Sequence, residues 1–174
     1  MNKTALLVID VQNDYFPDGR FPLWNTEKIL INIKELIAKA NQQHVPVFLV
    51  QHISSAPKGT APFFDRDRDS DGANIHPEIM AICPNAKVIQ KQHADSFHQT
   101  HLETLLEKFD IDELVICGMM TQNCVTHTAI SKKAERYKVS IIEDCCTTTD
   151  RMIHNISLNA VSVRVPLLAL SKVF

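Results

Sequence analysis

Cys124 stands where a buried strand gives way to a helix, a position in which its sulfur could act as a nucleophile. Residues 114–117 are apolar, Gly118 interrupts them, and Cys124 falls at the expected start of the helix. Helix N-termini carry unpaired backbone N–H groups and a positive dipole end, which stabilise a thiolate and could hold an oxyanion. The alternative is that Cys124 is a small buried apolar residue, as free cysteines usually are.

Two charged residues are expected near this cysteine. Asp10 directly follows the apolar run Thr4–Ile9, where a carboxylate is costly without a partner. It could be a general base that takes the thiol proton and returns it to a leaving group, or it could cap a turn. Lys91 follows another short strand, and its ammonium could lower the thiol pKa, or it could be a solvated loop lysine.

The elements that would position these residues alternate between strand and helix. Apolar runs predict strands at residues 4–9, 45–50, 86–90, 113–117, 139–143 and near the end of 163–170. Helical spacing predicts helices at residues 25–44, 100–109, 121–137 and 150–160, the last capped by Asp150.

This alternation predicts a single α/β domain over residues 1–174, a three-layer α/β/α sandwich around a mostly parallel sheet of about six strands. Ligand sites in such sheets lie beyond the carboxyl ends of the strands. Asp10, Lys91 and the segment before Cys124 are all expected there, so three residues with complementary chemistry should meet.

Composition excludes several classes of protein. A net charge of -2 argues against nucleic-acid or anionic-membrane partners, and no apolar run approaches the roughly 20 residues of a membrane span. The first strand begins too early to leave room for a signal peptide. Five cysteines without a CxxC motif predict neither a disulfide framework nor a zinc ribbon, so we expect a cytoplasmic protein.

In their order and spacing, these motifs resemble the isochorismatase-like cysteine hydrolases. An Asp ends the first strand, Lys91 precedes a Ser-Phe-x-x-Thr segment at 96–100, and Gly-x-x-Thr-x-x-Cys-Val occupies 118–125. Matching segments at Ile75–Glu78 and from Glu143 to His154 extend the resemblance over essentially the whole chain. It implies a hydrolase acting on a small polar molecule, most simply at the C–N bond of an amide or ureide.

The resemblance also implies roles for individual residues. Cys124 would attack the substrate carbon, Asp10 would shuttle the proton, and Lys91 would orient Asp10 and stabilise the thiolate. A cis peptide bond is implied at Met119–Met120, with the backbone N–H groups of Met120 and Cys124 forming an oxyanion hole. No cofactor is implied.

The substrate pocket is predicted from positions near the strand exits. Its expected members are Phe16, Trp24, His52, His93, Phe97, Met119 and Met120. Members of the family commonly pair, so we expect a homodimer or a larger homo-oligomer. The sequence does not identify the substrate, because such residues lie on variable loops.

Three departures from familiar patterns qualify this picture. The Asp-x-His zinc motif of nicotinamidases is absent, since Gln51–Ser54 lacks its Asp. His52 and His76 remain, which are too few for a zinc site, and we predict no metal. Residues 67–78 fit the spacing of a calcium loop, but Asn74 replaces an apolar residue and prolines precede it. A charged loop that roofs the site, with Phe63 and Phe64 as an apolar wall, is favoured. Arg136 replaces a helix-ending glycine, which predicts a modest strain or a different cap.

Two alternatives stay open. The enzyme could be an isochorismatase, because hydrolysis of a vinyl ether could proceed by acid catalysis without a nucleophile. Cys124 could instead be an oxidant-sensing thiol on a non-catalytic scaffold. Asp10 favours a hydrolase over a sensor, because a sensor has no use for a carboxylate that shuttles protons.

Overall fold

A six-stranded parallel sheet forms the centre of the computed structural model, which describes residues 3–57, 59–65 and 71–174. The strands are β1 (Thr4–Ile9), β2 (Val47–His52), β3 (Lys87–Lys91), β4 (Glu113–Met119), β5 (Lys138–Thr147) and β6 (Leu167–Leu168). Their order is β3-β2-β1-β4-β5-β6, and every recorded pairing of these strands is parallel. β1 is almost wholly buried, as expected of a strand covered on both faces.

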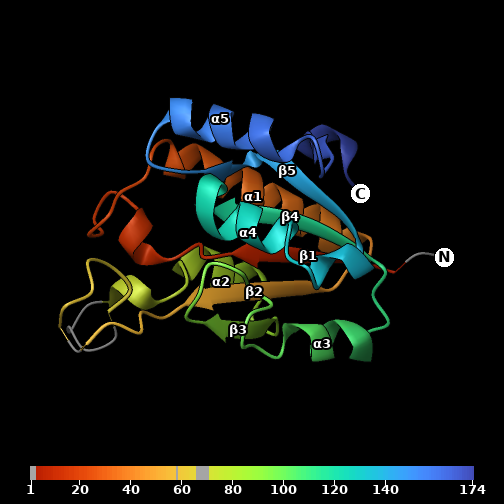
Figure 1. Cartoon of the computed structure of the whole chain (residues 1–174), viewed down its shortest axis with the longest axis horizontal. Coiled ribbons are helices and arrows are strands. Elements are labelled where there is room, and N and C mark those ends of the chain that lie inside the picture. The colour runs from red at the N-terminus through yellow and green to blue at the C-terminus, as the bar shows by residue number, and fades with distance from the viewer. Residues whose placement is uncertain (1–2, 58, 66–70) are drawn as a thin grey trace.

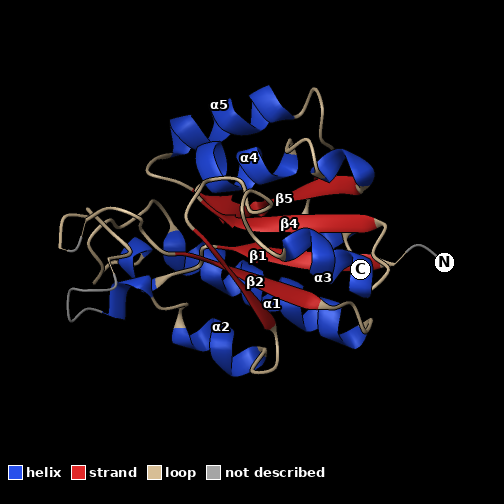
Figure 2. Ribbon diagram, turned by 60° about the horizontal axis from the view of Figure 1, so that its bottom comes forward, coloured by secondary structure: helices blue, strands red, loops and turns tan. Residues whose placement is uncertain are grey.

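Helices cover both faces of the sheet, as Figure 2 shows. They are α1 (Thr26–Gln42), α2 (Pro77–Ile82), α3 (Leu102–Lys108), α4 (Thr126–Ala129) and α5 (Arg151–Val161). α1 and α2 share one face, and α3, α4 and α5 lie on the other. Chain order explains this division: the chain leaves β1 toward β3, then crosses back to β4, and right-handed crossovers in opposite directions place helices on opposite faces. The predicted α/β/α sandwich is confirmed.

The strand order brings the exits of β1 and its neighbours together. β1 lies between β2 and β4, with Ile9 paired to Val50 and Gly118. In Figure 1 the arrowheads of β2 and β3 point toward the loops at the left of the molecule. Gly118 permits this close approach, because a Cβ at that residue would lie 2.0 Å from the carbonyl oxygen of Ile9.

The predicted helix at 121–137 is wrong in its length. One turn of π-helix spans Thr121–Val125, α4 ends at Ala129, and residues 134–136 form a separate 3₁₀ turn. Side-chain hydroxyls explain the early end: Thr128 bonds to Ser96, and Ser131 donates to Asp95 across 2.7 Å. Hydroxyl side chains that bond elsewhere compete with helix continuation, and periodicity alone does not reveal such distant partners.

The C-terminal elements also differ from the prediction. β5 continues to Thr147, beyond the expected 139–143, and β6 is only two residues long. Arg136 adopts no left-handed conformation; it ends the 3₁₀ turn and its guanidinium pairs with Glu103 and Glu107. The expected different cap is therefore present. Among the described residues, none of the helices combines the length and apolarity needed to cross a bilayer.

Candidate active site

Asp10, Lys91 and Cys124 meet at the carboxyl edge of the sheet. The Lys91 ammonium lies 2.8 Å from Asp10 Oδ2 and 3.1 Å from Cys124 Sγ. All three residues are buried, with Asp10 fully excluded from solvent and Lys91 and Cys124 each only 2% exposed. Buried charges persist only when they are paired, so the lysine and the aspartate stabilise each other beside the thiol.

Lys91 has more neighbours than it has protons. Its ammonium also lies 3.1 Å from the His93 carbonyl oxygen and 3.2 Å from His52 Nδ1. An ammonium offers three donors, whereas four atoms capable of accepting surround it. One contact therefore lacks a proton at any moment, and the ammonium can redirect a donor toward whichever group becomes negative.

Burial favours the thiol form of the resting cysteine. Burial and the nearby Asp10 raise the pKa of Cys124 to about 12, and Lys91 lowers that pKa by less. Burial also acts against the charge of Lys91, but Asp10 and Cys124 outweigh it and raise the lysine pKa. The site thus holds a carboxylate–ammonium pair beside the thiol, and Lys91 acts on the pKa of Cys124 in the expected direction.

The turn before the cysteine provides backbone donors. The Met119–Met120 peptide bond is cis, and Cys124 lies in the helical turn that begins directly after Met120. N–H groups in the first turn of a helix lack helical acceptors. Thr121 fixes this turn to α5, because its hydroxyl lies 2.9 Å from Nδ1 of the buried His154.

Gln12 is a structural residue that motif reasoning did not single out. Its buried side-chain nitrogen Nε2 donates to the carbonyls of His52 and Ala73, and its oxygen Oε1 accepts from the N–H of His52. Each of these three hydrogen bonds is 2.8 Å long. These bonds join the carboxyl ends of β1 and β2 to the segment around Ala73. An amide two residues after a strand-ending carboxylate is the signal that could have revealed it.

Asp14 anchors the predicted roof. Its carboxylate accepts from the N–H of Phe64 at 2.6 Å and of Arg20 at 3.3 Å. Phe64 is buried and its ring lies 4.6 Å from that of Tyr15 and 5.9 Å from that of His52. Phe64 of the expected apolar wall therefore lies beside His52, whereas residues 66–70 of the loop expected to roof the site lie outside the described residues.

The predicted pocket residues separate into two groups. His52, His93 and Met120 lie at the site: the first two contact Lys91, and Met120 directly precedes the turn that carries Cys124. His93 also lines a cavity of about 210 Å³ with Lys91 and Gln99.

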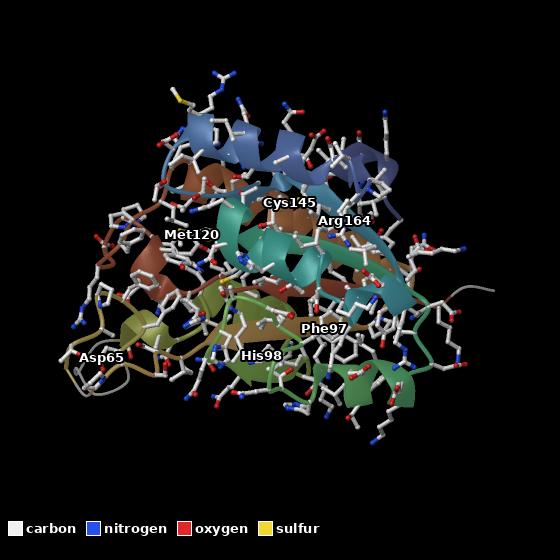
Figure 3. The ribbon with its side chains drawn as sticks, viewed as in Figure 1. Asp65, Phe97, His98, Met120, Cys145 and Arg164 are labelled. Carbon is white, nitrogen blue, oxygen red and sulfur yellow. The ribbon has the colours of Figure 1, made fainter. Side chains whose placement is uncertain are left out.

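The remaining four have other surroundings. Trp24 is partly exposed beside His154, with ring centroids 6.0 Å apart, and Met119 is fully buried in the sheet. Phe16 packs on His76, and Phe97 stacks on Tyr137 in the core. Figure 3 places Phe97 toward α3, whereas Met120 lies toward the strand exits. Spacing along the chain placed Phe97 after a strand but did not reveal which way its ring turns.

The residues of the two metal patterns have other partners where the structure describes them. His76 caps α2, accepts from Glu78 N–H at 3.3 Å and packs against Phe16, away from a set with His52. In the calcium-like loop, positions 67 and 69 lie outside the described residues, and Glu78 pairs with Lys34.

The chain is similar to several known proteins over most of its length. Residues 4–169 match the family model described as the isochorismatase domain. The isochorismatase family protein YddQ of Bacillus subtilis (strain 168) is 38% identical over 152 residues, covering 87% of this chain and 82% of that protein. Nicotinamidase 3 of Arabidopsis thaliana is 27% identical over 161 residues, 88% of this chain and 78% of that protein. A putative isochorismatase hydrolase from Oleispira antarctica has a TM-score of 0.86 at 34% identity, covering 98% of this chain and 95% of that chain.

Proposed function

Because the chain belongs to the isochorismatase family, whose members are hydrolases, we propose that it hydrolyses the C–N bond of a small amide or ureide through a covalent intermediate on Cys124. The observation that carries this proposal is the Lys91 ammonium, which lies within hydrogen-bonding distance of both Asp10 and Cys124 in a buried site. A nucleophile, a base and a cation that holds them together are the parts that acyl transfer needs. The relative named Nicotinamidase 3 supports an amide as the substrate class.

In the first half of the proposed reaction, the Cys124 thiol proton passes to Asp10 as the sulfur attacks the substrate carbon. The backbone N–H groups of Met120 and Cys124 receive the resulting oxyanion. Protonated Asp10 then gives its proton to the leaving nitrogen, the C–N bond breaks and the amine departs. Lys91 redirects a donor toward the sulfur or the carboxylate as negative charge moves between them.

In the second half, water attacks the thioester carbon and gives a proton to Asp10. The C–S bond breaks, the acid product leaves, and the proton returns to Cys124. Asp10 therefore acts as base and acid twice in one cycle, and the enzyme returns to its starting protonation state. This cycle needs no cofactor, and we propose none.

The resting state of Cys124 argues against a sensor. Oxidant-sensing cysteines are exposed and have a lowered pKa, whereas burial here raises the pKa of Cys124 to about 12 and leaves it 2% exposed. Attack by such a thiol requires proton transfer within the bound complex, which the adjacent carboxylate provides. These properties favour a hydrolase.

The test is hydrolysis of a panel of small amides, ureides and isochorismate by wild type, Cys124→Ala and Asp10→Asn. We expect ammonia release by wild type and a loss of at least about 10³-fold in both variants. Cys83→Ala is the matched control, because that buried thiol directly follows α2 and bonds to Ile79. Amide hydrolysis that survives Cys124→Ala would overturn the proposal, and isochorismate turnover that survives it would indicate ether hydrolysis.

We further propose that the chain forms a single domain, acts in the cytoplasm on a small molecule and assembles as a homodimer or larger homo-oligomer. All five cysteines are free, which supports a reducing compartment. Size-exclusion chromatography with light scattering tests the assembly: a mass of one chain at working concentration would contradict it.

A further inference from the structure

Three side chains of different ligand chemistry converge at one point in the active site. Asp10, His52 and Cys124 each place one potential ligand atom so that all three atoms lie within 4.8 Å of one another. Sulfur, imidazole nitrogen and carboxylate oxygen are the ligands that Zn²⁺ takes in tetrahedral sites. Within the described residues, Asp10 Oδ1 has no hydrogen-bond partner, so one carboxylate oxygen is still available.

The Lys91 ammonium occupies the middle of this set. It lies 2.8 Å from Asp10 Oδ2, 3.1 Å from Cys124 Sγ and 3.2 Å from His52 Nδ1. Metal–ligand bonds to zinc are about 2.0 to 2.3 Å, so the three side chains would need to close by roughly 1 Å each around an ion. The ammonium is thus a cation held where a metal ion would otherwise be coordinated.

We propose that the active site is a latent binding site for one thiophilic divalent ion such as Zn²⁺, coordinated by Cys124, His52 and Asp10 and opposed by the Lys91 ammonium. On binding, the S–H bond of Cys124 breaks, its proton goes to solvent, and a sulfur–metal bond forms without any change of oxidation state. The same event removes the nucleophile and the proton shuttle, so the ion inhibits hydrolysis reversibly. Lys91 therefore has a second role, which is to keep metal ions out.

Displacement of the ammonium is feasible because it keeps another acceptor. The His93 carbonyl, 3.1 Å from Lys91 Nζ, belongs to none of the three ligands. Two cations in the middle of a buried site repel each other strongly. The ammonium must therefore move away from the three ligand atoms before the metal ion binds. Replacing Lys91 by an uncharged residue should accordingly strengthen metal binding while it abolishes catalysis.

The test measures Zn²⁺ binding directly by titration calorimetry, and Co²⁺ binding by the thiolate-to-cobalt charge-transfer band. We expect one ion per chain in wild type and binding at least about tenfold tighter in Lys91→Met. Cys124→Ser should remove the charge-transfer band, and His52→Phe should weaken binding at least about tenfold. Cys83→Ser, a thiol outside the set, should bind as wild type does.

Binding is read without substrate, so a wrong choice of substrate class leaves this result intact. Circular dichroism checks that each variant is folded; if Lys91→Met is not, wild type against Cys124→Ser and His52→Phe decides. Binding that Cys124→Ser leaves unchanged, or that Lys91→Met weakens, overturns the proposal. Failure of Zn²⁺ to bind wild type and every folded variant overturns it as well.

Discussion

At the scale of single residues, the feature of the site is that Lys91 has one more potential acceptor around its ammonium than it has protons to donate. Asp10, Cys124, His52 and the His93 carbonyl all lie within 3.2 Å of its nitrogen. Because the ammonium can redirect its donors, the thiol proton can move to Asp10 without leaving any charge alone in a buried space. Sequence spacing predicted that Asp10, Lys91 and Cys124 meet, but the contact of His52 with Lys91 depends on the register between β2 and β3.

His52 links the site to stability at low pH. Burial, and next the Lys91 charge, lower the pKa of His52 to about 4, so the folded protein holds it neutral. Between the unfolded pKa near 6.5 and the folded value, the unfolded chain binds more protons. Stability from this residue is therefore complete above about pH 6.5 and is lost as pH falls toward 4, by on the order of 3 kcal/mol.

The predicted change is a flatter pH profile in His52→Asn, whose amide oxygen can still accept from Lys91 but does not titrate. Free energies of unfolding from urea melts between pH 4 and 7 measure it. We expect wild type to lose more stability than the variant over this interval. Equal losses in the two proteins would show that His52 is not held neutral by the fold.

At the scale of elements, the turn that carries Cys124 contacts a helix that follows it in sequence by some thirty residues. Thr121 follows the Met119–Met120 bond, and its hydroxyl pairs with His154 of α5. Asp150 places α5 by capping it, with its carboxylate accepting from Ile153 N–H at 2.9 Å. We infer that His154 is a positioning residue for the backbone donors beside Cys124.

Thr121→Val should lower kcat by about tenfold with little change in KM, because the oxyanion contact strengthens only in the transition state. His154→Phe should do the same, and the double variant should be no worse than either alone. Thr121→Ser keeps the hydroxyl and should retain activity. Steady-state kinetics on the substrate found in the panel measure this; a rise in KM alone, or additive losses, would assign the pair to general packing.

At the scale of the whole molecule, burial governs the chemistry of every thiol. Cys117, Cys145 and Cys146 are completely buried, and Cys83 and Cys124 are nearly so. Burial raises the pKa of all five. A cysteine is reactive when it is exposed and ionised to the thiolate. Burial in the native fold opposes both conditions for these five thiols.

A thiol-reactive chromogenic reagent should therefore label none of the five cysteines rapidly in the native protein at neutral pH and all five in denaturant. The absorbance of the released chromophore counts them. Wild type and Cys124→Ala should behave alike in the native state. Rapid native labelling that disappears in Cys124→Ala would instead reveal an exposed thiolate and revive the sensor hypothesis.

Much of this architecture was readable from the chain. Buried apolar runs and helical spacing predict the alternation of strands and helices, since periodicity follows directly from which faces are buried. Asp10, Lys91 and Cys124 were predictable because parallel strands place their carboxyl ends at one edge of a sheet. The family motifs, likewise, are local in sequence.

Only the tertiary structure decided how those residues are used. The early end of α4 follows from bonds between Thr128, Ser131 and a loop some thirty residues before them. Two further features depend on which distant groups fold against a side chain. One is the set of hydrogen bonds that Gln12 and Asp14 make with later segments, and the other is the core position of Phe97. The pKa of Cys124 has the same origin, because burial and neighbouring charge are properties of the packed molecule and not of residue order.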